Sequence, residues 1–123
     1  MRTIIAGGRD CTNPYLLLEA LDNCGWEPTC IISGMAKGAD TLGVQYAEDC
    51  GIPLIRCYPA WNLPSGAFDR TAGFKRNEEM ATLADGLIAL WDSYSKGTAD
   101  MINRAKKHKL RTFVYLYEKS SNQ

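Results

Sequence analysis

The chain has 123 residues, a length that favours one domain with a hydrophobic core of its own. Its 14 Lys and Arg residues balance 14 Asp and Glu residues, and 46% of the chain is hydrophobic, as in an ordinary soluble globular protein. This balance disfavours a protein drawn by its overall charge to nucleic acid or to a membrane surface. In addition, no apolar run approaches the roughly 20 residues that a membrane span needs.

The N-terminus and the cysteines point to a reducing compartment. Met1-Arg2 leads directly into an apolar segment, which is not the pattern of a signal peptide, so we expect a cytoplasmic protein. The cysteines are odd in number, lack CxxC spacing, and predict neither a disulfide framework nor a zinc site. They are Cys11, Cys24, Cys30, Cys50 and Cys57. His108 is the only histidine, and we expect no metal and no cofactor.

Short apolar runs alternate with amphipathic segments along the chain. The first run, residues 3–6, ends at Gly7-Gly8, and Asn13-Pro14 then predicts the start of a helix that Gly25 ends. Further strands are expected at residues 29–32, 54–58, 86–90 and 112–116, and further helices at residues 39–50, 72–83 and 97–107. The tail loses apolar character, so we expect residues 1–117 to form the domain and residues 118–123 to fray.

This alternation predicts an α/β fold. Strands that are apolar on both faces indicate a parallel sheet that is covered by helices on both sides. Right-handed crossovers make 3-2-1-4-5 the most economical strand order, with the switch point between the first and fourth strands. The predicted architecture is a single three-layer domain around a five-stranded parallel sheet.

Three turns that follow predicted strands are rich in glycine. They are Gly7-Gly8-Arg9-Asp10, Ser33-Gly34-Met35-Ala36-Lys37-Gly38-Ala39-Asp40, and Ser95-Lys96-Gly97-Thr98. Glycine lets backbone N–H groups approach a ligand closely, and a helix N-terminus adds positive potential for an anion. Each motif alone is weak, because many such turns only reverse the chain. All three open on the carboxyl edge of the predicted sheet, and their convergence predicts an anion-binding site there.

The turn before the last helix is the best candidate for a phosphate. The amides of Gly97 and Thr98, the Thr98 hydroxyl and the helix end can hold a phosphate, with Ser95 or Lys96 beside it. The order Lys-Gly-Thr differs from the Gly-Lys-Ser/Thr of a Walker A loop. The alternative interpretation is a capped helix that follows a turn.

Two further candidates lie outside the glycine-rich turns. The irregular stretch of residues 59–71 is long for a compact domain and carries Trp61, which can stack on a base or plug the core. Arg76 shares a helix face with Met80 and Leu83, and it can point over the sheet edge toward a phosphate. A surface ion pair is the alternative for Arg76.

Several other polar or aromatic residues have two interpretations each. Asp10 can cap the first helix, bind a ribose hydroxyl or pair with Arg9. We interpret Asp40 as structural, because the dipole of its helix stabilises a carboxylate in the first turn. Trp91 is as ambiguous as Trp61. A cluster of cations is interpreted as a solvated helix end rather than a nucleic-acid patch; it comprises Lys106, Lys107, Lys109 and Arg111.

The motifs follow one another in the order of a known family. After the first two glycine-rich turns come Pro59-Ala60-Trp61, Ala72-Gly73-x-x-Arg76-Asn77-x-x-Met80 and Trp91-Asp92-x-x-Ser95-x-Gly97-Thr98. Together, over nearly the whole chain, they resemble the YspA-like branch of the SLOG superfamily, which also holds the LOG phosphoribohydrolases and the DprA/Smf DNA-processing proteins. The resemblance implies a Rossmann-like fold that binds a nucleotide or nucleotide-derived ligand, such as a nucleoside phosphate, ADP-ribose or an NAD-like molecule.

The resemblance also suggests roles for residues. Arg76 and Asn77 match the family's Arg-Asn pair, and LOG-type enzymes pair such an arginine with a glutamate three residues beyond their Gly-Thr loop. That position is Met101 here, and Asp100 lies one residue earlier, about 100° around a helix. Arg76 and Asp100 are therefore the expected catalytic residues if the protein is a slow N-glycosidic hydrolase. Otherwise we expect a sensor or a sequestering protein.

The expected ligand-binding residues are Gly7, Gly8, Arg9, Asp10, Ser33, Gly34, Lys37, Gly38, Trp61, Asn77, Ser95, Lys96, Gly97 and Thr98. Two other functions stay open. A DprA-like nucleic-acid module is disfavoured by the neutral charge and the lack of a long basic stripe. A structural subunit with a vestigial pocket is disfavoured by the intact glycine-rich turns. We expect a small-molecule partner and no membrane partner, while the oligomeric state, a homo-oligomer included, stays open.

Overall fold

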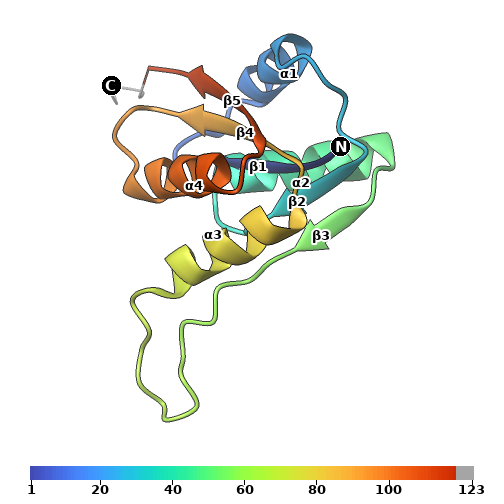
Figure 1. Cartoon of the computed structure of the whole chain (residues 1–123). Coiled ribbons are helices and arrows are strands. Elements are labelled where there is room, and N and C mark those ends of the chain that lie inside the picture. The colour runs from blue at the N-terminus through green and yellow to red at the C-terminus, as the bar shows by residue number, and fades with distance from the viewer. Residues whose placement is uncertain (119–123) are drawn as a thin grey trace.

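The computed structural model describes residues 1–118, in which five strands and four helices alternate along the chain (Figure 1). The strands are β1 (Arg2–Gly7), β2 (Cys30–Ser33), β3 (Leu54–Arg56), β4 (Gly86–Trp91) and β5 (Arg111–Leu116). The helices are α1 (Pro14–Asn23), α2 (Ala39–Cys50), α3 (Ala72–Leu83) and α4 (Lys96–Lys107). Every predicted element is present, with differences only at the ends. The predicted fraying of the tail concerns residues that, apart from Glu118, lie outside the described part of the chain.

All five strands are parallel and follow the predicted order β3-β2-β1-β4-β5. The central pair joins β1 to β4, with Thr3 opposite Gly86 and Gly7 opposite Leu90. The chain moves from β1 outward to β3 and then crosses back to β4. The connections that leave β1 and β4 therefore diverge, and open α/β sheets bind their ligands in the crevice at such a point.

Side chains of each strand point alternately to two helical layers. On one face, strand residues pack with α1 and α2; the largest fully buried ones are Ile5, Ile31, Ile88 and Leu90. On the other face, strand residues pack with α3 and α4; the largest fully buried ones are Ile4, Ile32 and Leu87. Figure 1 shows α3 and α4 side by side in front of the sheet. These two layers explain why the strands are apolar on both faces.

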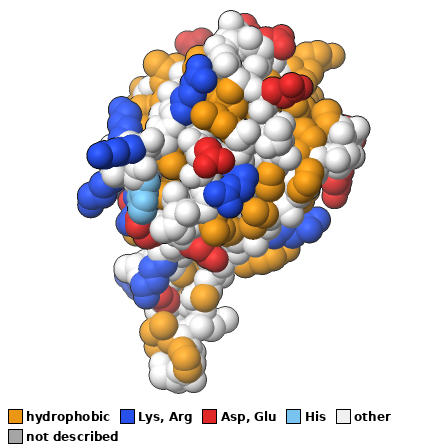
Figure 2. All heavy atoms as spheres, turned by 45° about the vertical axis from the view of Figure 1, so that its right-hand side comes forward, with side chains coloured by type: hydrophobic (Ala, Val, Ile, Leu, Met, Phe, Trp, Pro, Cys, Tyr) orange, Lys and Arg blue, Asp and Glu red, His pale blue; other side chains and the backbone are white. Residues whose placement is uncertain are grey.

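Residues 57–71, here called the arm, leave the body between β3 and α3 (Figure 1). In the arm, Asn62 forms an antiparallel bridge with Phe68, and the Trp61 ring stacks on the Phe68 ring at 5.6 Å between centroids. Figure 2 shows the arm as a narrow projection that carries hydrophobic side chains. The long irregular stretch predicted from the sequence is thus an ordered projection next to the start of α3.

Within residues 1–118, no helix combines the length and the apolar character that a bilayer crossing requires. All five cysteines are free thiols. Burial raises the pKa of the Cys11 thiol to about 11 and also raises that of Cys57, so neither favours the reactive thiolate. In the same part of the chain, no three His, Cys, Asp or Glu side chains gather as a metal site would require.

Candidate functional site

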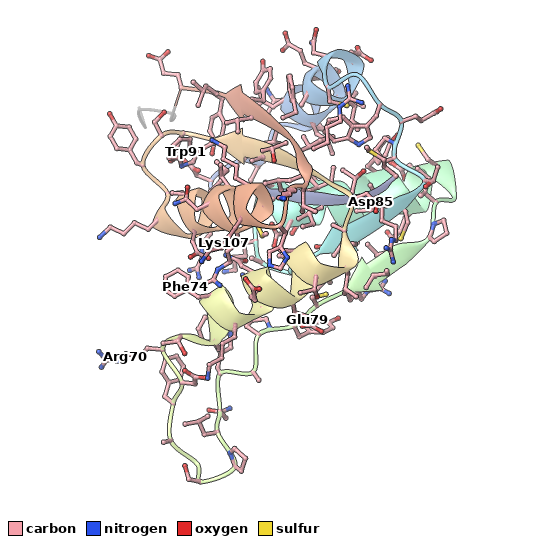
Figure 3. All side chains as sticks on the ribbon, in the orientation of Figure 1. Arg70, Phe74, Glu79, Asp85, Trp91 and Lys107 are labelled. Atoms are coloured by element: carbon pink, nitrogen blue, oxygen red, sulfur yellow. The ribbon has the colours of Figure 1, made fainter. Side chains whose placement is uncertain are left out.

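A cleft of about 740 Å³ opens at the carboxyl edge of the sheet, where the turns after β1, β2 and β4 meet the start of α3 and the base of the arm. Its volume lies in the range of small-molecule sites, roughly 300–1,000 Å³. Figure 3 shows Arg70, Phe74 and Trp91 on the side where the strands end, and Asp85 at the opposite edge. The predicted convergence of the glycine-rich turns on one edge is therefore present.

Two of the glycines bring the turns after β1 and β2 against each other. Gly38 precedes α2 with φ +80°, and an added Cβ there would lie 2.6 Å from the carbonyl carbon of Arg9. A Cβ on Gly7 would lie 2.7 Å from the Cβ of Ala39. The Ala39 amide donates to the Gly8 carbonyl at 3.1 Å. Gly7 and Gly38 are thus required by packing within the protein, and Gly38 does not line the cleft.

The turn after β2 is shaped by two buried polar side chains. The Ser33 hydroxyl accepts a hydrogen bond from the Met35 amide at 3.1 Å, and the Asp40 carboxylate accepts one from the Ala36 amide at 3.1 Å. Met35 has the unusual φ of +60°. Ser33 is fully buried and does not line the cleft, so its contribution is to shape the turn.

Asp40 lines the cleft although its residue is only 5% exposed. Burial raises its pKa to about 6, against the opposing effects of the Ala36 amide and the Arg76 guanidinium. The sequence interpretation as a merely dipole-stabilised carboxylate missed this position in the cleft wall. A signal was present, because Asp40 shares its helix face with the buried residues Gly43 and Ala47.

Arg76 reaches from α3 across to the turn after β2. Its Nη1 donates to the Gly34 carbonyl and its Nε donates to Asn77 Oδ1 at 3.2 Å. An added Cβ on Gly34 would lie 2.8 Å from the Arg76 Cζ, so the guanidinium would have to shift from this position to admit it. Burial lowers the pKa of Arg76, while the charge of Asp40 acts in the opposite direction. Arg76 lines the cleft.

Asn77 joins α3 to the first turn of α4. It is 5% exposed, and its Nδ2 donates both to the Gly97 carbonyl at 3.2 Å and to Asp100 Oδ2 at 3.0 Å. Its Oδ1 accepts from Arg76. One buried amide therefore connects the guanidinium that faces the cleft with the helix start that faces it from the other side.

The start of α4 is both capped and open to the cleft. The Ser95 hydroxyl accepts from the Thr98 amide at 3.4 Å, and the Asp92 carboxylate accepts from the amides of Tyr94 and Ser95 at 2.8 Å each. Trp91 donates from its ring nitrogen to the Ser95 carbonyl at 3.1 Å and so supports the turn. Beyond the chain neighbours and the backbone of α4 itself, no atom lies within 4 Å of an added Cβ on Gly97, so that side of the residue faces open space.

Arg9 and Asp10 both line the cleft, but not in the arrangements considered from the sequence. Asp10 Oδ1 accepts from the Tyr117 hydroxyl at 3.0 Å, whereas α1 is capped by Asn13, which accepts from the Tyr15 amide at 3.0 Å. Among the ion pairs of residues 1–118, none joins Arg9 to Asp10.

The mouth of the cleft carries aromatic and cationic side chains that sequence reasoning partly missed. Trp61 lines it and is 37% exposed. Phe74, Tyr94 and Arg70 also line it. These three residues are exposed and lie in turns or at a helix start, where no periodic pattern marks an inward position.

Most of the predicted site residues line the cleft together. The exceptions are Ser33, Gly38, Lys96 and Asp100. Asp100 instead binds Asn77 and accepts from Arg104 Nε at 2.8 Å. Met101, one residue further along α4, is 1% exposed and lines the cleft. The neighbouring side chains thus point in the two directions that a helical step of about 100° implies.

Comparisons with known proteins agree with this architecture. Among solved structures, DNA processing protein A (DprA) from Streptococcus pneumoniae superposes with a TM-score of 0.73 at 19% sequence identity, over 92% of this chain and 49% of that protein. This likeness shows the fold, and the present chain spans about half the length of DprA. No curated protein sequence matches the chain. Residues 1–63 match the model of the YspA, cpYpsA-related SLOG family, and the chain belongs to that family.

Proposed function

We propose that the protein binds a nucleotide or nucleotide-derived ligand in this cleft, with a phosphate group between Arg76 and the first turn of α4. The observation that carries the proposal is that a guanidinium and a helix N-terminus face one cleft and are joined by Asn77. A guanidinium suits phosphate oxygens, and a helix N-terminus favours negative charge. Membership of the SLOG family supports a ligand of this class.

The charges around the cleft also favour an anionic ligand. The side chains of Arg9, Lys37 and Arg70 line it and form no hydrogen bond or ion pair within residues 1–118. Three carboxylates also line the cleft, and all of them accept hydrogen bonds from the protein's own donors; they are those of Asp10, Asp40 and Asp92. The exposed aromatic rings at the mouth offer surfaces on which a base can stack. An anion with an attached base therefore matches both parts of the cleft.

The geometry favours binding without rapid turnover, as in a sensor or a sequestering protein. At the position where LOG-type enzymes carry a glutamate, Met101 faces the cleft, and the carboxylate of Asp100 lies outside its lining. A slow N-glycosidic hydrolase with Arg76 and Asp100 is the alternative. We expect no free base when the protein is incubated with nucleoside monophosphates and the mixture is separated by chromatography. Rapid release of base that Asp100→Asn removes would favour the hydrolase.

The binding proposal is tested by calorimetric titration with AMP, ADP-ribose and NAD, with adenosine as the ligand that lacks phosphate. We expect phosphate-bearing ligands to bind more tightly than adenosine and to raise the apparent melting temperature. Gly97→Val should abolish binding while the protein stays folded, because its side chain would fill the space at the start of α4. Equal affinity of adenosine and AMP, or unchanged affinity in Gly97→Val, would show that no phosphate binds at the first turn of α4.

A nucleic-acid module remains the second candidate, because DprA shares the fold. Affinity for a phosphate backbone depends on many cationic contacts, and this chain has a formal net charge of zero. We expect weak binding of single- and double-stranded DNA with a shallow salt dependence in fluorescence anisotropy. Tight binding at physiological salt with a steep salt slope would favour this second function.

A further inference from the structure

A chain of side-chain contacts runs from the far end of α4 to the cleft. His108 Nε2 lies 2.7 Å from Glu78 Oε2, and Arg104 Nη1 donates to Glu78 Oε1 at 3.0 Å. Arg104 also donates through Nε to Asp100 Oδ2 at 2.8 Å, and Asp100 accepts from Asn77 at 3.0 Å. Of the residues in this series of contacts, only Asn77 lines the cleft; the others, His108, Glu78, Arg104 and Asp100, do not.

Asn77 connects this series of contacts to two parts of the ligand site, Arg76 and the first turn of α4. Its Nδ2 meets two acceptors, the Gly97 carbonyl and Asp100, while its Oδ1 meets one donor, Arg76 Nε. The reversed amide would place oxygen against both acceptors and nitrogen against the donor. Asp100 and the Gly97 carbonyl therefore determine which way the amide of Asn77 points, and so which atom it offers to Arg76.

We infer that Asp100 and Arg104 are positioning residues, which act through Asn77 to hold Arg76 and the first turn of α4 in the geometry that binds phosphate. Arg104 bridges Asp100 and Glu78 and thereby fixes the Asp100 carboxylate. Asp100 in turn fixes the Asn77 amide. This inference rests on the proposed ligand site and gives Asp100 a role that needs no contact with the ligand.

Affinity measurements on a matched set of variants provide the first test. Asp100→Ala should weaken the binding of AMP or ADP-ribose roughly three- to tenfold, the effect of one net hydrogen bond. Asp100→Asn keeps an oxygen acceptor and should restore most of the affinity. Asp49→Ala is the control, because Asp49 accepts from Gln45 at 2.8 Å with the same four-residue spacing on α2, away from the cleft. Equal effects of Asp49→Ala and Asp100→Ala would overturn the inference.

A double-mutant cycle separates action through Asn77 from a general effect on stability. If Asp100 acts through Asn77, Asp100→Ala causes little further loss of affinity when Asn77→Ala is already present. A purely structural role of Asp100 would instead give losses that multiply. Additive free energies in this cycle therefore contradict the inference.

A measurement without ligand keeps the inference testable if no nucleotide binds or if Asn77→Ala does not fold. The Nε–H signal of Arg76 in proton–nitrogen correlation spectra, identified by its loss in Arg76→Lys, reports the hydrogen bond to Asn77. We expect its exchange with water to become at least tenfold faster in Asp100→Ala and to stay unchanged in Asp49→Ala. Unchanged exchange in Asp100→Ala refutes the positioning role. Failure of the wild type to bind any nucleotide refutes only the proposed function.

Discussion

Gly38 and Gly97 begin two helices at the same edge of the sheet, but they meet different surroundings. A Cβ on Gly38 would collide with the backbone of Arg9, and the following amide, that of Ala39, already donates to the Gly8 carbonyl. A Cβ on Gly97 would meet no atom within 4 Å. The start of α2 is therefore occupied by the protein's own chain, whereas the start of α4 faces the cleft. Similar glycine-rich motifs thus serve packing in one region and leave room for a ligand in the other.

The largest effect on stability is expected at Gly38, where the start of α2 packs against the turn after β1. Gly38→Ala should lower the free energy of unfolding by about 3 kcal/mol or more, because the methyl group collides with backbone and φ is +80°. Gly51→Ala is the control for backbone strain alone, since Gly51 has φ +67° and no atom within 4 Å of an added Cβ. It should cost only about 1–2 kcal/mol. Equal losses in denaturant titrations would mean that contact with the Gly8-Arg9 turn contributes nothing.

The second effect concerns the carboxylate that α2 contributes to the cleft. The pKa of Asp40 is about 6 in the folded protein, above its ordinary value of 3.8. Between these pH values the folded state holds a proton that the unfolded chain has released. Stability therefore falls as pH rises through this window. Relative to Asp40→Asn, the wild type should lose about 2–3 kcal/mol of unfolding free energy between about pH 4 and pH 7.

Denaturant titrations of both proteins across that pH range measure this difference directly, because the other titrating groups are common to both. Parallel pH profiles of the wild type and Asp40→Asn would show that the carboxylate is not destabilised by burial. The interpretation from the sequence, a structural carboxylate that the dipole of its helix stabilises, would then hold.

The fold was predictable because the apolar runs and the glycine-rich turns obey local rules. Alternating runs that are apolar on both faces leave few arrangements for a chain of this length, and the order β3-β2-β1-β4-β5 is one of them. Arg76 was also predictable, since its helical spacing to the buried Met80 indicates a shared inward face. Local spacing is thus sufficient where an element has a clear buried side.

The parts of the site that could not be predicted depend on contacts between distant segments. Arg70 and Tyr94 lie outside the regular elements, so no period indicates that they face the cleft. The hydrogen bond from Asn77 to Asp100 joins residues 23 positions apart in sequence, so no local pattern predicts it. The ion pair between Asp100 and Arg104 has the four-residue spacing of neighbours on a helix surface, which the sequence contains. That spacing alone does not show whether Asp100 faces the cleft.

The third effect tests whether Arg76, which faces the start of α4 across the cleft, binds the ligand. Arg76→Ala should weaken the binding of AMP or ADP-ribose by about 1.5–3 kcal/mol, the range for a hydrogen bond to a charged group. Arg76→Lys should not recover the lost affinity, because the ammonium lacks the planar guanidinium whose nitrogens donate to Gly34 and Asn77. Arg56→Ala removes the same charge outside the cleft lining and is the control. Comparable losses in both alanine variants would point to overall charge as the cause.

The smallest effect on stability is expected at Gly97, and it completes the comparison. Gly97→Ala should change the free energy of unfolding by less than about 1 kcal/mol, because the added methyl group meets no atom and alanine favours a helix over glycine. The same change at Gly38 should unfold much of the population at moderate denaturant. If the start of α4 is the phosphate site, Gly97→Ala nevertheless weakens AMP binding, since the methyl group lies where the phosphate approaches the amides. A loss of stability at Gly97 as large as that at Gly38, with unchanged affinity for AMP, would show that both glycines serve packing and that the ligand lies elsewhere.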